Sequence, residues 1–119
     1  MGVVLIVEDD DDIRDSLANL LVAEGYEVAT AKNGAEGLTV ATQVRPWLIL
    51  LDLRMPDLDG WAFRERQLRD PQLAPIPVVL MSAVQNIRNE AAELGVADYL
   101  VKPVALALLL NVVQRHSSS

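Results

Sequence analysis

Residues 3–15, VVLIVEDDDDIRD, join an apolar run directly to five consecutive acids, Glu8 to Asp12. The run at residues 3–7 is rich in β-branched side chains and has no polar interruption, which is typical of a strand buried on both faces. Acids packed this closely repel one another, so their presence needs a physical reason. Three explanations stay open at this point: a solvated turn, a helix cap and a metal site. More than one of them can apply to the same run.

The rest of the chain alternates short apolar runs with helical stripes. Further strands are expected at residues 26–30, 47–51, 76–81 and 99–101. Helices are expected from residue 13 to Gly25, from Asn33 to Pro46, over residues 61–69, up to about Gly95, and after Pro103. Five strands alternating with five helices predict an α/β fold with a parallel sheet and right-handed crossovers.

Composition limits the class of protein. With 119 residues, 51% of them hydrophobic and 23% charged, the chain fits one compact domain. It has no cysteine, which excludes disulfides and thiolate metal sites and is consistent with a reducing compartment. No apolar run is long enough to cross a bilayer, and the net charge of −7 disfavours nucleic-acid binding. We therefore expect a cytoplasmic domain with no membrane contact and no direct contact with nucleic acid.

Chemically active residues stand at the ends of four predicted strands. They are Glu8, Asp9, Asp52, Ser82 and Lys102. The carboxyl ends of parallel strands share one edge of the sheet, where ligands bind. Three carboxylates there need a cation, and all-oxygen ligation suits Mg²⁺, which commonly bridges to phosphate oxygens. A carboxylate nucleophile, a metal ion, a lysine and a hydroxyl are the groups that form an aspartyl phosphate.

The sequence resembles the receiver domains of bacterial two-component response regulators over nearly its whole length. The resemblance is carried by VLIVEDD, LLDLRMPDLDGW, PVVLMSA and ADYLVKP, in the family's order. It implies a single doubly wound (βα)5 domain of the flavodoxin-like class over residues 1–116, with strand order 2-1-3-4-5. Residues 117–119 are then expected to be a disordered tail.

The resemblance also implies a role for each site residue. Asp52 matches the phosphoacceptor, which receives its phosphoryl group from a sensor histidine kinase or a phosphotransfer protein. Asp9 matches a direct Mg²⁺ ligand, Glu8 the acid that holds metal-bound water, and Arg54 the residue that offers its backbone carbonyl to the metal.

The remaining matched positions belong to the phosphate contacts and the switch. Ser82 and Lys102 match the pair that contacts the phosphoryl group, and Lys102–Pro103 resembles a bond that is frequently cis in the family. Tyr99 matches the aromatic switch residue that turns inward when Ser82 moves. The domain is expected to catalyse only its own phosphorylation and dephosphorylation, and therefore not to be an enzyme acting on a metabolite.

The acid run then divides into two parts. Glu8 and Asp9 are the metal acids. Asp10, Asp11 and Asp12 are expected to cap the first helix and to occupy its first turn, where negative charge meets the positive end of the helix dipole.

Other classes of acidic site and other functions compare with this pattern as follows. A calcium-binding EF-hand is excluded because the acid run lacks the glycine required at the sixth loop position. A haloacid-dehalogenase-type phosphatase would need a second Asp two residues after Asp52, where Arg54 stands. A different Mg²⁺-dependent phosphohydrolase and a phosphate-independent interaction module stay open as functions. Tyr99 also has a simpler interpretation, as an ordinary core or rim aromatic.

One departure from the family pattern, and one pair of residues near the active site, concern this end of the domain. The stretch from Ser82 to Lys102 is shorter than is typical, so the fourth helix is expected to begin late or to be partly a loop; a harmless deletion is the alternative. Arg54 and Val84 should flank the water that hydrolyses the phosphoryl group and so influence its lifetime.

The last helix, within VALALLLNVVQRH, has apolar residues on two sides. The stripe expected to face the core is Leu106, Leu109, Leu110 and Val113. The stripe expected to be exposed is Ala105, Leu108 and Val112. Such a surface suggests a homodimer or effector contact through the fourth and fifth helices, the alternative being a helix with a few exposed aliphatic side chains.

Overall fold

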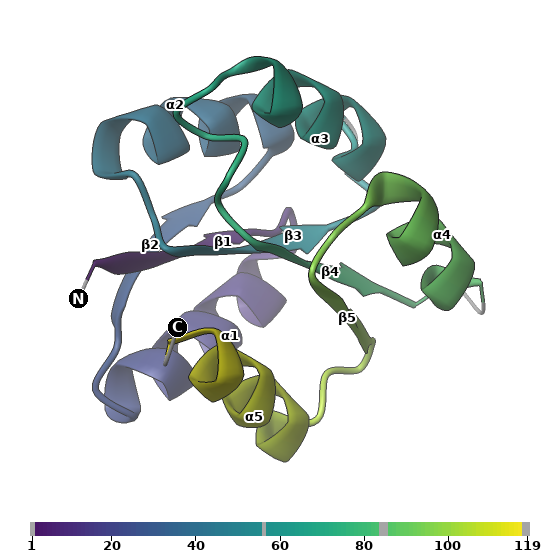
Figure 1. Cartoon of the computed structure of the whole chain (residues 1–119). Coiled ribbons are helices and arrows are strands. Elements are labelled where there is room, and N and C mark those ends of the chain that lie inside the picture. Colours follow the sequence, from purple (N-terminus) through teal and green to yellow (C-terminus); the bar gives the residue numbers. More distant parts are fainter. Residues whose placement is uncertain (1, 56, 84–85, 118–119) are drawn as a thin grey trace.

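The computed structural model, which describes residues 2–55, 57–83 and 86–117, is a three-layer α/β domain (Figure 1). The strands are β1 Val3–Val7, β2 Glu27–Ala31, β3 Leu48–Asp52, β4 Val78–Ser82 and β5 Asp98–Val101. The helices are α1 Asp11–Ala23, α2 Gly34–Val44, α3 Gly60–Arg69, α4 Ile87–Leu94 and α5 Leu106–Ser117. Strands and helices alternate along the chain, as the sequence predicted.

The sheet is entirely parallel, with strand order β2-β1-β3-β4-β5. The predicted order is therefore confirmed. The order reverses between β1 and β3, and in an open parallel sheet this reversal places a crevice beyond the carboxyl ends of the two strands. Asp52, the last residue of β3, lies at that edge opposite Met81 of β4.

Helices cover both faces of the sheet, and each face has its own apolar core (Figure 1). On one face α2, α3 and α4 pack against alternate residues of β1, β3 and β4, with Phe63 and Ile87 among the buried side chains. On the other face α1 and α5 pack against the intervening residues, with Leu21 and Leu109 fully buried. Because both faces are covered, the central strands are apolar up to the last residues of β3 and β4.

The helix starts follow from local capping, as expected for the acids after β1. The Asp10 side chain accepts the N–H of Ile13 at 3.0 Å, and Asp11 and Asp12 occupy the first turn of α1. Asn33 accepts the N–H of Glu36 at 2.8 Å and so caps α2. The assignment of the last three acids of the run to the first helix is thus confirmed.

Three strands lie one or two residues later than the sequence pattern indicated. β2 begins at Glu27 instead of residue 26, β3 at Leu48 instead of 47, and β4 at Val78 instead of 76. Pairing explains the shift, because β2 starts where Glu27 meets Val3 of β1. As a result Asp52 and Ser82 are the final residues of their strands, not the residues that follow them.

The predicted faces of the last helix were wrong at two positions, whereas Leu109 and Val113 are buried as expected. Val112, expected on the exposed stripe, is only 4% exposed, whereas Leu106, expected in the core, is 59% exposed. Leu108 is 60% exposed, as expected. The buried stripe is Leu109, Val112 and Val113, whose spacing also fits one face of a helix. With apolar residues all around its first turns, the sequence of α5 is compatible with either orientation.

The end of α5 also differs slightly from expectation. The helix continues through Ser117, which was assigned to the tail; residues 118 and 119 lie outside the described part of the chain. No helix in the described ranges has both the length and the apolar character needed to cross a membrane.

Candidate acidic site at the carboxyl edge of the sheet

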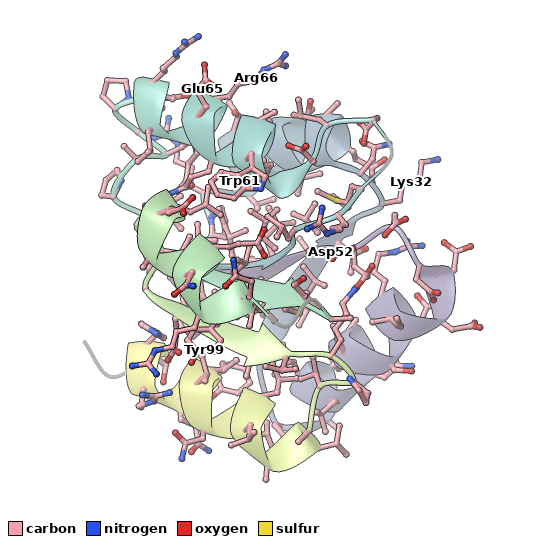
Figure 2. The ribbon with its side chains drawn as sticks, turned by 90° about the vertical axis from the view of Figure 1, so that its right-hand side faces the viewer. Lys32, Asp52, Trp61, Glu65, Arg66 and Tyr99 are labelled. Atoms are coloured by element: carbon pink, nitrogen blue, oxygen red, sulfur yellow. The ribbon has the colours of Figure 1, made fainter. Side chains whose placement is uncertain are left out.

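The strand-end residues singled out in the sequence lie together around one hollow of about 290 Å³. Its lining residues include Glu8, Asp9, Asp52, Ser82 and Lys102, together with Arg54. They come from the ends of β1, β3, β4 and β5, and Figure 2 shows Asp52 at this edge of the sheet. The parallel topology therefore collects the five strand-end residues and Arg54 in one place.

Three carboxylates crowd this hollow. One oxygen from each of Glu8, Asp9 and Asp52 lies within 4.8 Å of the others. Glu8 is fully buried and Asp52 is 4% exposed, whereas Asp9 is exposed. The pKa of Asp52 is raised to about 7, chiefly by burial and then by the neighbouring Glu8, while Lys102 acts in the opposite direction. The cluster is short of positive charge, and its all-oxygen donors fit a hard divalent cation such as Mg²⁺.

Lys102 supplies part of that charge. Its Nζ lies 2.6 Å from Glu8 Oε1 and 3.2 Å from Asp52 Oδ1. Burial lowers the pKa of Lys102, but its contacts with Glu8 and Asp52 outweigh this effect, so the pKa is raised and the ammonium stays charged. The N–H of Lys102 donates to the Ser82 carbonyl at 2.9 Å, which ties the end of β4 to the same residue. The bond from Lys102 to Pro103 is cis, as the resemblance implied.

Arg14 stabilises the turn after β1 and was not found from the sequence. Its Nη1 donates to the Glu8 carbonyl at 3.0 Å, and its Nη2 pairs with Asp11. The N–H of Asp10 donates to Glu8 Oε2 at 3.2 Å. These contacts hold Glu8 at the edge of the hollow. A lone arginine in the first turn of a helix carries no sequence signal for such a role.

The loop between β3 and α3 is fixed against α2. Asp57 accepts the first two N–H groups of α2, each at 3.4 Å. Gly34 is needed at this contact, because a Cβ there would lie 2.2 Å from the Leu58 carbonyl oxygen. Within the loop, the N–H of Arg54 donates to Asp52 Oδ1 at 3.4 Å. The loop is thus held against the start of α2, and its residue Arg54 is hydrogen-bonded to Asp52.

Tyr99 lies away from the acidic hollow, on the α4 side of β5, between α4 and α5 in Figure 2. It is half-buried and, with residues of α4 that include Arg88 and Ala91, lines a second hollow of about 240 Å³. Tyr99 therefore lies next to α4, and its role as a switch stays a prediction. Val84, expected near the hydrolytic water, lies outside the described residues.

The fold and this hollow together define the class of protein: a doubly wound α/β domain that gathers carboxylates and a lysine at the reversal of its strand order. Residues 4–114 match the response regulator receiver domain family, so the chain belongs to that family.

Similar proteins agree with this membership. The chain is 45% identical to the transcriptional regulatory protein PrrA of Mycobacterium tuberculosis, with 93% of this chain and 48% of PrrA covered. It is 38% identical to the DNA-binding dual master transcriptional regulator RpaA of Synechocystis, with 93% and 47% covered. The chain therefore spans about half the length of these relatives. Chemotaxis response regulator CheY4 of Vibrio cholerae has the same fold, with a TM-score of 0.89, 31% identity and 98% of each chain covered.

The expectation of no direct contact with nucleic acid stays a prediction. RpaA is named as a DNA-binding regulator, and the matched region is only about half of that protein. The present chain has a net charge of −7, which argues against nonspecific binding by this region.

Proposed function

We propose that the chain is a phosphorylation-controlled switch in which Asp52 receives a phosphoryl group from the histidine of a sensor kinase or a phosphotransfer protein. One observation carries the proposal. Asp52 is almost fully buried, yet it lines an open hollow with Lys102 at 3.2 Å and two further carboxylates within 4.8 Å. A structural carboxylate would not need this crowding, whereas a phosphoacceptor with a metal site does.

The chemistry follows from the positions of the side chains. A carboxylate oxygen of Asp52 attacks the phosphorus, a new P–O bond forms, and the P–N bond to the donor histidine breaks. Lys102 lies close enough to Asp52 to pair with the phosphoryl oxygens, and the Ser82 hydroxyl belongs to the same hollow. Asp9, Asp52 and the backbone carbonyl of Arg54 would hold a Mg²⁺ ion and Glu8 would hold its bound water; the ion would supply neutralising charge to the transferring group.

The domain is proposed to modify only itself and not to turn over an external substrate. The new phosphoryl group then biases a surface that includes α4 and Tyr99, through which a partner reads the state of the domain. A cytoplasmic location is part of the same proposal. A homodimer or effector contact through the fifth helix is still proposed for Leu108, which is exposed. Val112 is buried and is therefore removed from this proposed surface.

The test is intact mass spectrometry after incubation with acetyl phosphate and Mg²⁺. Wild type and a control, Asp15→Asn on the exposed side of α1, should each gain one phosphoryl group, and Asp52→Asn should gain none. An equal gain in Asp52→Asn, or no gain in wild type, would contradict the proposal. Hydrolysis of p-nitrophenyl phosphate by wild type but not by Asp52→Asn would instead favour the phosphohydrolase alternative.

A further inference from the structure

Glu90 of α4 is a nearly buried carboxylate that pairs with one cation, Arg54, among the residues that the structure describes. Its Oε2 lies 3.6 Å from Arg54 Nη2, and its side chain is 14% exposed. Its Oε1 is buried and has no hydrogen-bond partner among the described residues. Arg54, by contrast, is 66% exposed along its side chain and free to reorient. A buried carboxylate that loses its partner is destabilising, so the position of Glu90 depends on Arg54.

The two ends of α4 are held in different ways. At the carboxyl end, Arg64 of α3 donates to the carbonyls of Leu94 at 3.0 Å and Gly95 at 2.8 Å. At the amino end, Asn86 accepts no capping hydrogen bond within the described part of the chain. α4 has only 8 residues, too few to be stable without tertiary contacts. Beyond its buried apolar face, the tie that the described residues give its amino-terminal half to the rest of the domain is the pair formed by Arg54 and Glu90.

Arg54 stands beside the proposed phosphoacceptor. Its N–H donates to Asp52 Oδ1 at 3.4 Å, and the residue is part of the lining of the acidic hollow. A phosphoryl group on Asp52 would carry about −1.5 to −2 charges in place of the single charge of the carboxylate, and it would add three acceptor oxygens to that hollow. A guanidinium binds phosphate oxygens with two parallel hydrogen bonds, which a carboxylate at 3.6 Å does not match.

We propose that Arg54 contacts the phosphoryl group by giving up Glu90, and that this exchange releases the amino-terminal half of α4 while Arg64 keeps its carboxyl end in place. The inference rests on the proposed function, because it needs a phosphoryl group on Asp52. Without Arg54, the Glu90 carboxylate moves toward water. The movement displaces Ile87, which is 3% exposed, and reshapes the hollow that α4 forms with Tyr99. Figure 2 shows this side of the molecule, with α4 in front, α3 above it and Asp52 beside it.

The ion pair is tested first without phosphorylation, by hydrogen exchange with mass spectrometry. Glu90→Gln keeps the shape of the side chain and removes its charge. We expect amides 88–91 to exchange about two- to fivefold faster than in wild type, the size that a partly exposed ion pair allows. Glu93→Gln, at an exposed position of the same helix, is the control and should not change them. Equal exchange in wild type and Glu90→Gln would overturn the proposal.

The exchange of partners is tested next in protein whose phosphorylation is verified by intact mass. Phosphorylation of wild type should speed exchange at amides 88–91 and leave amides 94–96 unchanged. In Arg54→Met the same amides should already exchange faster than in wild type before phosphorylation, and their exchange rates should change little after it. A response in phosphorylated Arg54→Met as large as in wild type would overturn the role of Arg54.

A third variant tests the fixed end of α4. Arg64→Met should speed exchange at amides 94–96 in both states, and unchanged exchange there would overturn the anchoring role of Arg64. If no protein gains a phosphoryl group, the proposed function fails and the exchange of partners fails with it. The comparison of wild type with Glu90→Gln still decides by itself whether the ion pair holds α4.

Discussion

The Lys102 ammonium lies 2.6 Å from Glu8 Oε1, which joins the segment after β5 to the end of β1. The two strands are not neighbours in the sheet, since β3 and β4 lie between them. Lys102 also lies 3.2 Å from Asp52 at the end of β3, so the three side chains are linked at this edge of the sheet. The ammonium also places a positive charge beside the proposed phosphoacceptor before any phosphoryl group arrives.

Replacing Lys102 with methionine, which is similar in length, should have two effects. Phosphorylation of Asp52 by acetyl phosphate should slow by about 10²-fold, because one preorganised charge is lost from the transferring group. The free energy of unfolding in EDTA should fall by about 2 kcal/mol, since Glu8 and Asp52 lose their cation. Mass spectrometry over time and urea denaturation measure the two effects. A variant that is phosphorylated at the wild-type rate would contradict the assigned contact.

Mg²⁺ binding should depend on Asp9. Asp9→Asn should weaken binding by roughly tenfold or more, because one of three clustered carboxylates is removed. Isothermal titration calorimetry measures the affinity directly. Asp12→Asn removes an equal charge from the first turn of α1 and is the matched control. Equal weakening by both variants would mean that net charge, and not ligation, governs binding.

Shortening a side chain to alanine should affect the free energy of unfolding differently on the two faces of α5. Val112→Ala should lower the free energy of unfolding by about 2 kcal/mol, because it removes buried methyl groups and leaves a small cavity. Leu108→Ala, at a side chain that is 60% exposed, should change it by less than about 0.5 kcal/mol. Urea denaturation distinguishes the two. A larger loss of unfolding free energy in Leu108→Ala than in Val112→Ala would contradict the burial of Val112.

Asp57 should give the domain a pH-dependent share of its stability. Partial loss of hydration raises the pKa of Asp57, but backbone N–H groups, those of Gly34 and Ala35 among them, lower it more, so the folded pKa is below the ordinary value of 3.8. The contribution is complete above the unfolded pKa and is lost as pH falls through the lowered folded pKa. Wild type should exceed Asp57→Asn in unfolding free energy at pH 6, and the difference should shrink below about pH 4. If the difference in unfolding free energy between wild type and Asp57→Asn grew on acidification, the pKa of Asp57 would be shifted in the opposite direction.

Local patterns predicted most of the fold and the members of the candidate site. The uninterrupted run at residues 3–7 indicated a strand covered on both faces, and Asn33 marked a helix start that the structure confirms. The site residues were found because each stands at the end of an apolar run, and parallel strands bring such ends to one edge. The exact strand limits were less predictable, since the pairing of Glu27 with Val3 sets the start of β2.

Contacts between distant elements were not predictable in this way. Arg54 was expected to contribute only its backbone and an effect on hydrolysis, and its ion pair with Glu90 depends on where α4 lies against the sheet. Arg64 has no sequence signal for its contacts with Leu94 and Gly95, because they depend on the packing of α3 against α4.

The sequence by itself determined the alternation of strands and helices, the division of the acid run, and the set of groups at the carboxyl edge. These follow from periodicity, capping and charge, which act over a few residues. Only the tertiary structure decided which side of α5 is buried, and which cations pair with Glu8 and Glu90. Those outcomes depend on how helices rotate and settle against a shared sheet, where several apolar faces compete and only one packing fills the core.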